Sequence, residues 1–200
     1  MPRKKYHHGD LKNALIQAGI EILSKEGMEG LSLRKVAQRA GVSHSAPYSH
    51  FPDKQSLIAA ISTEGFSQLY AELDAAICAY PKDPKKQLQQ GTLAYLQFAL
   101  NNTDTFKIMF SGILVEKEKE YPAFVEISHK TFQRVVDVVQ ACQEVGIMRA
   151  TSAEMMAVAV WGQLHGVVSL ALEGQIPHTV LDDYKVEDVV AFAVEQMMVP

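Results

Sequence analysis

Apolar residues recur every three or four positions along almost the whole chain, a spacing that predicts amphipathic helices throughout. No segment sustains the alternation of apolar and polar residues that is expected of a half-buried strand. The first predicted helix has Asp10 as its N-cap and ends at Gly27 and Gly30. The hydropathy pattern therefore assigns the chain to the all-α class from its start.

Two short helices and one long helix are expected next. Ser32 caps a helix over residues 33–40, which Gly41 ends, and a further short helix covers residues 45–50. Pro52 breaks the chain, and Asp53 then caps a long helix that runs to about residue 79.

Turn-forming residues divide the remainder into five amphipathic segments, near residues 84–101, 103–112, 121–145, 152–173 and 186–198. We therefore predict about nine helices. An N-terminal three-helix domain with a helix-turn-helix occupies residues 1–55, and a long helix joins it to a C-terminal helical bundle within residues 56–200.

Charge is divided unevenly between these two parts. The chain as a whole carries 19 Lys and Arg against 23 Asp and Glu, a net charge of −4. Residues 1–55 hold nine of the basic and five of the acidic residues, a net +4, so residues 56–200 carry a net −8. A basic head on an acidic body is expected when only the head contacts a polyanion, although short windows also fluctuate in charge by chance.

Residues 32–51 carry the sharpest chemical signal. Two helices that cross steeply need a small residue at their contact, and Ala37 is such a residue. The tight turn between them needs a residue that tolerates positive φ, which Gly41 does. Val42 is placed to fill the angle between the helices, and Phe51 to anchor the second one. The spacing predicts a helix-turn-helix.

The same run resembles the DNA-binding head of the TetR family of regulators. The residues that carry the resemblance are Val36-Ala37, Ala40-Gly41-Val42-Ser43, Tyr48, His50-Phe51, Asp53-Lys54 and Leu57, within a match over about residues 9–58. The resemblance implies a homodimer formed through the last two helices, a palindromic DNA operator, and a small-molecule pocket in the bundle. Repression released by ligand is the commonest form in this family, and an activator is the alternative.

The resemblance also implies roles for individual residues. The start of the recognition helix faces the major groove, so His44, Ser45 and Ala46 are the candidates for base contacts. Tyr48 and His50 are expected to contact phosphate, and Lys54 lies at a helix N-terminus that favours anions. The full predicted DNA-binding set is Ser32, Arg34, Ser43, His44, Ser45, Ala46, Tyr48, His50 and Lys54, with Arg3, Lys4 and Lys5 as a further basic arm.

These roles have structural alternatives, and one residue departs from the family's pattern. Tyr48 could pack in the core, His50 could cap its helix, and Lys54 could be merely solvated. Pro47 stands where the family usually has a larger apolar residue, which puts the assignment of base contacts in doubt.

Trp161 and His165 lie four residues apart on one helical face, with Gly162 and Gly166 lowering the bulk of that helix. The arrangement resembles a Trp-His-Gly subgroup of TetR-type C-terminal domains. Two interpretations stay open, because the pair can pack in a dimer seam or line a pocket. The candidate ligand-binding residues are Tyr95, Phe98, Phe106, Met109, Phe110, Phe132, Trp161 and His165, which would suit an apolar ligand.

The sequence gives little indication of a membrane span, a reactive cysteine, an enzyme or a metal site. Residues 153–172 are read as a buried helix of a soluble protein, and Cys78 and Cys142 as inert buried thiols. No phosphate loop, nucleophile elbow or metal-ligand cluster is visible, so we expect no enzyme, cofactor or metal, and a cytoplasmic location. A helical module that binds protein instead of DNA is the remaining alternative, and the salt dependence of binding would distinguish it.

Overall fold

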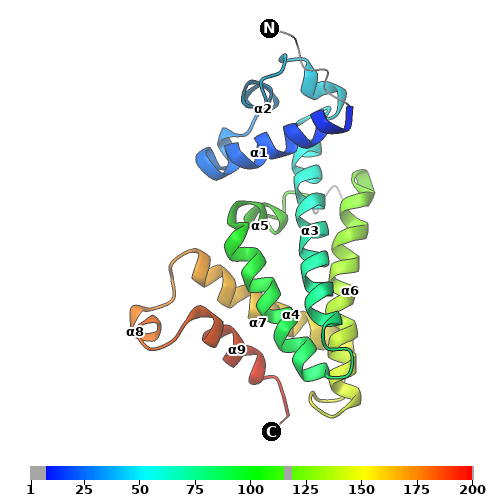
Figure 1. Ribbon diagram of the computed structural model, residues 1–200, viewed down its shortest axis with the longest axis vertical. Coiled ribbons are helices and arrows are strands. Elements are labelled where there is room, and N and C mark those ends of the chain that lie inside the picture. The colour runs from blue at the N-terminus through cyan, green and yellow to red at the C-terminus, as the bar shows by residue number, and fades with distance from the viewer. Residues whose placement is uncertain (1–7, 115–118, 200) are drawn as a thin grey trace. The chain divides into compact units, whose positions relative to one another are not determined.

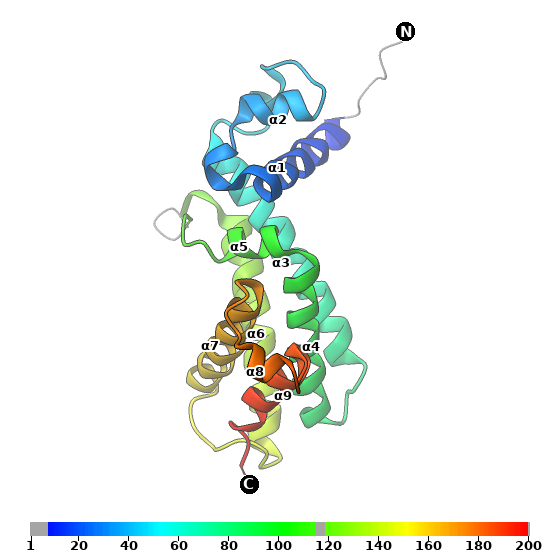
Figure 2. The same ribbon diagram turned by 90° about the vertical axis from the view of Figure 1, so that its left-hand side faces the viewer.

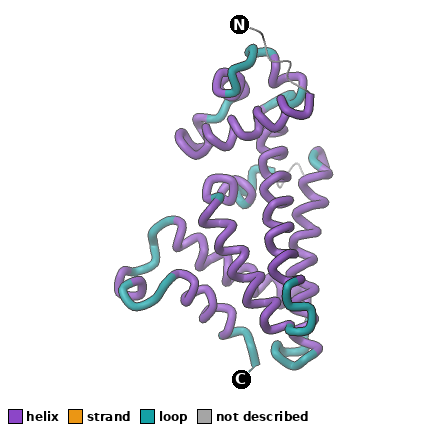
Figure 3. Tube along the Cα trace, in the orientation of Figure 1, coloured by secondary structure: helices purple, strands orange, loops and turns teal. Residues whose placement is uncertain are grey.

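The computed structural model describes residues 8–114 and 119–199. Over these residues the chain forms nine α-helices, one 3₁₀ helix and no strand, which confirms the all-α prediction (Figure 3). The predicted basic arm of Arg3, Lys4 and Lys5 lies outside the described residues.

Contacts divide the chain into two compact units. Unit 1 comprises residues 1–65 and 104–125, and unit 2 comprises residues 66–103 and 126–200. The boundary expected at residue 55, between the DNA-binding part and the C-terminal bundle, stays a prediction. The contacts instead divide the chain after residues 65, 103 and 125. Residues 104–125 return to the head because Ile108 and Leu114 are buried in its hydrophobic core, which also contains Leu15, Phe51 and Leu57.

Unit 1 contains five helical elements: α1 (His8–Gly30), α2 (Leu33–Arg39), the 3₁₀ helix η1 (Ala46–Ser49), the first half of α3 (Lys54–Cys78), and most of α5 (Thr103–Met109). Helices α1 and α2 pack against each other (Figure 2). The contact between α5 and α3 is very close, since a Cβ added at Gly65 would lie 2.5 Å from the Met109 sulfur.

The two ends of α1 test the expectation that Asp10 is its N-cap and that Gly27 ends it. Helix α1 begins at His8, so Asp10 lies inside the helix and not at its N-cap. Gly27 does end the regular part of this helix, because its φ of +67° is accessible to glycine and strained for other residues. At two later helix starts the prediction is confirmed, since the Ser32 hydroxyl accepts from the Lys35 N–H and the Asp53 carboxylate accepts from the Ser56 N–H.

The turn between α2 and η1 follows a Schellman pattern. The N–H of Gly41 donates to the Gln38 carbonyl oxygen at 3.2 Å, and the N–H of Val42 donates to the Ala37 carbonyl oxygen at 3.0 Å. Gly41 has a φ of +69°, as the pattern requires. Ala37 is fully buried, and Val42 packs against the core of the head. The predicted turn is confirmed in each of these respects.

The element expected as a helix over residues 45–50 is instead a 3₁₀ helix. Pro47 lies in its first turn, is buried, and has no N–H to give to a carbonyl four residues earlier. The Tyr48 N–H donates to the Ser45 carbonyl and the His50 N–H to the Pro47 carbonyl, both across three residues. His44 therefore precedes the helix, and although it is four residues from Tyr48, the two do not share the face of an α-helix.

Unit 2 contains the second half of α3 and the helices α4 (Pro84–Asn101), α6 (Pro122–Glu144, mostly), α7 (Ala153–Leu172), α8 (His178–Leu181) and α9 (Val186–Glu195). Helices α4, α7 and α9 lie against one another (Figure 1). The short helix α8 was not predicted, because four residues are too few to show a helical period. α5 and α9 end before their predicted limits.

Candidate nucleic-acid interface

The head exposes a polar surface over α2 and η1. Arg34, Ser43, His44, Ser45 and Tyr48 are exposed, and Tyr48 retains 58% of its surface. Tyr48 is therefore not a core residue, which removes one of the alternatives considered for it. Ser43, His44, Ser45 and Tyr48, all in the predicted DNA-binding set, are thus exposed on and just before the recognition element.

Two basic residues of α2 form ion pairs. Lys35 pairs with Glu26, and the Arg39 guanidinium lies 3.2 Å from the Glu21 carboxylate. Both acidic partners belong to α1, so these pairs hold the first two helices together. The Lys35 ammonium holds the pKa of Glu26 below its usual range. Arg34 forms no ion pair within the described residues, which leaves its guanidinium available to a partner.

The recognition turn is internally bonded. The hydroxyl oxygens of Ser43 and Ser45 are 3.2 Å apart, and the Ser49 hydroxyl donates to the Ala46 carbonyl at 2.7 Å. Pro47 is buried, whereas Ser43, His44 and Ser45 in the turn before η1 are exposed. Ala46 is half-buried and has only a methyl group to present to a base.

His50 and Lys54 lie differently from the exposed residues. The His50 ring is half-buried, and its Nε2 atom is buried without a hydrogen-bond partner among the described residues. The Lys54 ammonium donates to the Met28 carbonyl oxygen at 2.6 Å. Sequence reasoning did not foresee this contact, because 26 residues separate the two and no local pattern signals it.

The residues proposed for ligand binding fall into both units. Phe106, Met109 and Phe110 belong to unit 1, where the rings of Phe106 and Phe110 are 4.9 Å apart. The other five belong to unit 2, namely Tyr95, Phe98, Phe132, Trp161 and His165. Within unit 2, Phe98 is fully buried, and the other four form a cluster of aromatic rings.

Hydrogen bonds join three side chains of this aromatic cluster. The Trp161 indole N–H, which can only donate, lies 3.2 Å from the Tyr95 hydroxyl oxygen. The Tyr95 hydroxyl oxygen also lies 2.7 Å from Nδ1 of His165, and the tautomer of the imidazole sets which of the two donates. Burial raises the pKa of Tyr95 and lowers the pKa of His165, and both shifts favour the neutral form of the group.

The same contacts bear on whether Trp161 and His165 pack in a dimer seam or line a pocket. Both side chains reach Tyr95 on α4, and Trp161 also stacks at an angle on Phe132 of α6, with ring centres 6.2 Å apart. They therefore lie on the flank of α7 that faces its own bundle. The exposed positions of α7 are others, including Met155, Val158, Gly162, Gly166 and Leu170.

Helix α7 is far less covered than the sequence suggested. It is long and apolar enough to span a membrane by length and composition, yet one such helix is weak evidence for a membrane protein. Only 22% of its most apolar window is buried, so the expectation of a buried helix is wrong for the single chain. On α9, Phe192 is 63% exposed as well. The exposed apolar residues of these two helices are called here the α7–α9 face, namely Met155, Val158 and Leu170 of α7 and Phe192 of α9.

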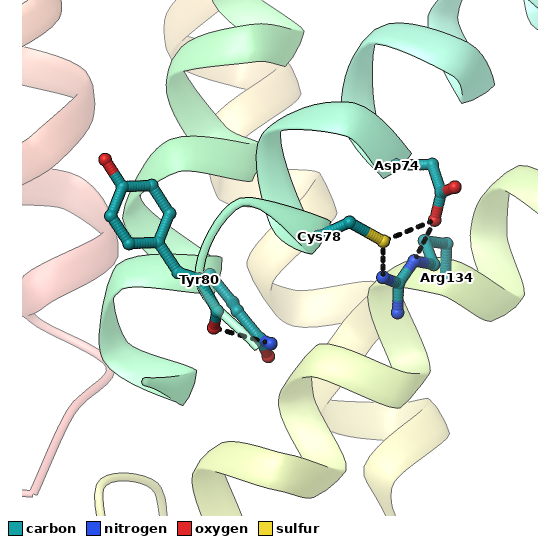
Figure 4. Close-up of polar contacts among 5 residues, drawn as sticks. Asp74, Cys78, Tyr80 and Arg134 are labelled. Carbon is teal, nitrogen blue, oxygen red and sulfur yellow. Dashed lines mark hydrogen bonds and ion pairs between the residues drawn. The ribbon is translucent and has the colours of Figure 1, made fainter. Parts of the chain in front are cut away.

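Cys78 is exposed, so the expectation that both cysteines are buried is wrong for this one, whereas Cys142 is buried. The Arg134 guanidinium donates to the Asp74 carboxylate at 2.8 Å and to the Cys78 sulfur at 3.5 Å (Figure 4). The arrangement ties α6 to the end of α3 within unit 2. No group of three or more potential metal ligands occurs among the described residues.

Two family models match different parts of the chain. Residues 15–61 match the family described as "Bacterial regulatory proteins, tetR family", and residues 88–197 match "Tetracyclin repressor-like, C-terminal domain". The class C tetracycline repressor of Escherichia coli is 41% identical over 51 residues, which is 26% of this chain and 23% of that repressor. The tetracycline repressors are thus matched over about a quarter of their length.

Solved structures resemble almost the whole chain. A protein of unknown function from Rhodococcus sp. RHA1 is 31% identical, with 98% of this chain and 97% of that chain covered and a TM-score of 0.81. A TetR family transcriptional regulator from Thermus thermophilus shares the fold at 19% identity, with coverage of 92% and 96% and a TM-score of 0.71. With its helix-turn-helix and both of its family matches, this chain belongs to the TetR family of DNA-binding transcriptional regulators.

Proposed function

We propose that the protein is a sequence-specific repressor that a small apolar ligand releases from a palindromic DNA operator. Residues 1–55 would read the DNA, and residues 56–200 would bind the ligand and form the dimer. The observation that carries the proposal is the exposed polar surface of α2 and η1, built on a Schellman turn at Gly41. The proposal includes a cytoplasmic location and requires no catalytic step.

DNA contacts are assigned by exposure. His44 and Ser45 are exposed in the turn that enters the major groove, and they would contact base edges. Tyr48 and Arg34, which are also exposed, would contact phosphate. Ser43 and Ser32 would add hydroxyl contacts at the two ends of the motif. His50 would contact phosphate only after its ring turns, because its Nε2 atom is buried.

The partner of the α7–α9 face is proposed to be a second copy of this chain. A Cβ added at Gly162 or at Gly166 would meet nothing within 4 Å, so neither glycine is required for packing in the single chain. Small residues at four-residue spacing let two helices approach closely, and a two-fold four-helix contact of α7 and α9 would cover the exposed apolar side chains.

Ligand release is proposed to act as a shift in population. A dimer fits DNA when its two heads are about 34–36 Å apart, one turn of the double helix. Ligand bound in the bundle would favour a different spacing of the heads. Helix α3 is the element suited to carry the change, since its first half belongs to unit 1 and its second half to unit 2. The aromatic cluster around Tyr95 is the proposed ligand-binding region.

The test is a selection from random DNA duplexes, followed by sequencing of the DNA that the protein retains. A palindrome with half-sites one helical turn apart is the expected result, and its affinity should fall linearly with salt on logarithmic axes. Enrichment of no sequence at low salt would contradict the proposal. Reporter expression from a promoter that contains the palindrome would separate repression from activation.

A further inference from the structure

We propose that Arg134 fixes the C-terminal end of α3 to α6, so that these two helices shift together when the bundle changes shape. Arg134 is then a positioning residue for DNA binding, and it contacts neither DNA nor ligand. The proposal rests on the proposed function, in which α3 carries the change between the bundle and the head. It adds α6 to that path, through one side chain of unit 2.

Arg134 binds the last part of α3 at two points (Figure 4). Its Nε–H donates to the Asp74 carboxylate at 2.8 Å, and its Nη2 donates to the Cys78 sulfur at 3.5 Å. Because Asp74 and Cys78 are four residues apart, the guanidinium spans one turn of α3. The ion pair is also partly covered, with the Arg134 side chain 21% exposed and that of Asp74 39%, so salt screens it less than a pair in open solvent.

The C-terminal end of α3 favours a cation that α3 does not itself contain. The carbonyl groups of the last helical turn have no partner within the helix, and they carry partial negative charge. Helix α3 ends at Cys78, its last turn contains no basic residue, and the carboxylate of Asp74 lies just before that turn. Both features favour a cation from another helix, and Arg134 of α6 is that cation.

A second cation of α6 contacts α3 one turn earlier. The Lys130 ammonium is 4.2 Å from the centre of the Tyr70 ring, a cation–π contact. Lys130 lies four residues before Arg134, on the same side of α6. Tyr70 likewise lies four residues before Asp74, on the same side of α3. Two cations in one row of α6 therefore contact one row of α3, and the two helices run in the same direction.

The opposite end of α3 belongs to the head. Leu57, Ile58 and Ile61 of α3 are buried in the hydrophobic core of unit 1, whereas the turn that Arg134 holds belongs to unit 2. A continuous helix held at both ends passes a displacement of one end to the other. In the proposed dimer, the attachment of α3 to α6 would then help to set the spacing of the two heads, which must match half-sites one turn of DNA apart. Without Arg134, the last turn of α3 can take several positions, and the spacing of the heads becomes less defined.

The test compares Arg134→Met with Lys86→Met in the full-length protein. Lys86 also belongs to unit 2 and pairs with Asp83 at 3.9 Å, but that pair lies within one helix start and does not join two helices. Binding is measured to the selected palindrome and to two versions of it, in which the half-sites are one base pair closer or one base pair farther apart. Amide hydrogen exchange in residues 74–80 is measured without DNA.

For Arg134→Met we expect exchange in residues 74–80 to become about tenfold faster, since hydrogen bonds to a charged group are lost. Affinity for the selected palindrome should fall, and the preference for it over the two altered spacings should shrink about tenfold. A loss of stability alone would lower the affinity for all three duplexes by one factor and leave that preference intact. Lys86→Met should keep both the preference and the slow exchange.

An Arg134→Met dimer that keeps the wild-type preference for spacing, or a wild-type protein without such a preference, would overturn the proposal. Asp74→Asn, which removes the charge of the partner at constant shape, is the second variant if Arg134→Met does not fold, and it should shrink the preference in the same direction. Selection of no palindrome by the wild-type protein would instead contradict the proposed function. The exchange arm would then decide alone whether Arg134 holds the end of α3.

Discussion

The two units of this protein distribute polar and apolar side chains in opposite ways. Unit 1 buries an almost wholly apolar core and exposes polar residues such as Arg34, His44 and Tyr48. Unit 2 exposes apolar residues on α7 and α9 and buries Tyr95, which is hydrogen-bonded to the half-buried His165.

The difference indicates what each unit requires from its surroundings. Unit 1 covers its own apolar core, and its exposed groups can exchange water for the phosphates and bases of DNA. Unit 2 leaves apolar surface in water, which is unfavourable by about 25 cal/mol for each Å² that a partner could cover. A buried polar group such as the Tyr95 hydroxyl also requires its hydrogen-bond partners, because it has lost its hydration.

The largest expected effect, on assembly and on DNA affinity, comes from placing a charge in the α7–α9 face. Gly166→Arg should leave the chain folded, because its Cβ has free space, and it should place a charge in the proposed dimer contact. Light scattering should then report 22.1 kDa in place of twice that mass. Binding to a palindromic duplex should weaken roughly a hundredfold or more, since the two heads are no longer linked.

The exposed Gln140 on α6 provides the control for this change. Gln140→Arg adds the same charge to a helix of the same unit and should leave the mass of the assembly unchanged. A Gly166→Arg protein that keeps the mass of a dimer would show that the partner of this face is not a second copy.

The next effect concerns the polar group buried in unit 2. Tyr95→Phe keeps the ring but removes the hydroxyl that bonds Trp161 and His165. The free energy of unfolding should fall by about 2 kcal/mol, because two partly buried groups lose a partner. Urea unfolding monitored by circular dichroism measures the change. Tyr80→Phe is the control, since that hydroxyl makes no hydrogen bond within the described residues, and an equal loss in both variants would contradict the argument.

The polar surface of unit 1 can be tested at a single hydroxyl. Tyr48→Phe should weaken binding to all DNA sequences about tenfold, the loss of one hydrogen bond to a charged group, and should leave the sequence preference unaltered. Fluorescence anisotropy with selected and unselected duplexes tests both statements. Ser49→Ala is the matched control, because that hydroxyl is bonded to the Ala46 carbonyl. A change in sequence preference with Tyr48→Phe would mean that the residue reads bases.

The smallest expected effect, on the free energy of unfolding, concerns a single buried hydroxyl in α3. Ser62 is fully buried in α3, and its hydroxyl has no hydrogen-bond partner among the described residues. Ser62→Ala should raise the free energy of unfolding by about 1 kcal/mol, because an unsatisfied polar group is removed. The exposed Ser24 in α1 controls for helix propensity. A destabilised Ser62→Ala protein would indicate that the hydroxyl has a partner in solution, such as a buried water molecule.

Local chemistry made much of the fold predictable. Ser32 and Asp53 cap helices, and Gly41 adopts positive φ, because each of these features depends on a few neighbouring residues. The 3₁₀ form of η1 was not predicted, although Pro47 in its first turn has no N–H to donate. The exposure of Cys78 was missed because helical position alone does not tell which face a neighbouring helix covers.

The sequence by itself determined the helical class, the turn between α2 and η1, and the family to which the head belongs. These depend on residue spacing and on backbone preferences over a few positions. Only the tertiary structure decided that Lys54 reaches Met28, that residues 104–125 join the core of the head, and that Trp161 and His165 bond to Tyr95. Such contacts join residues far apart in the chain, and they form where side-chain shape and hydrogen-bond geometry match after the helices have packed.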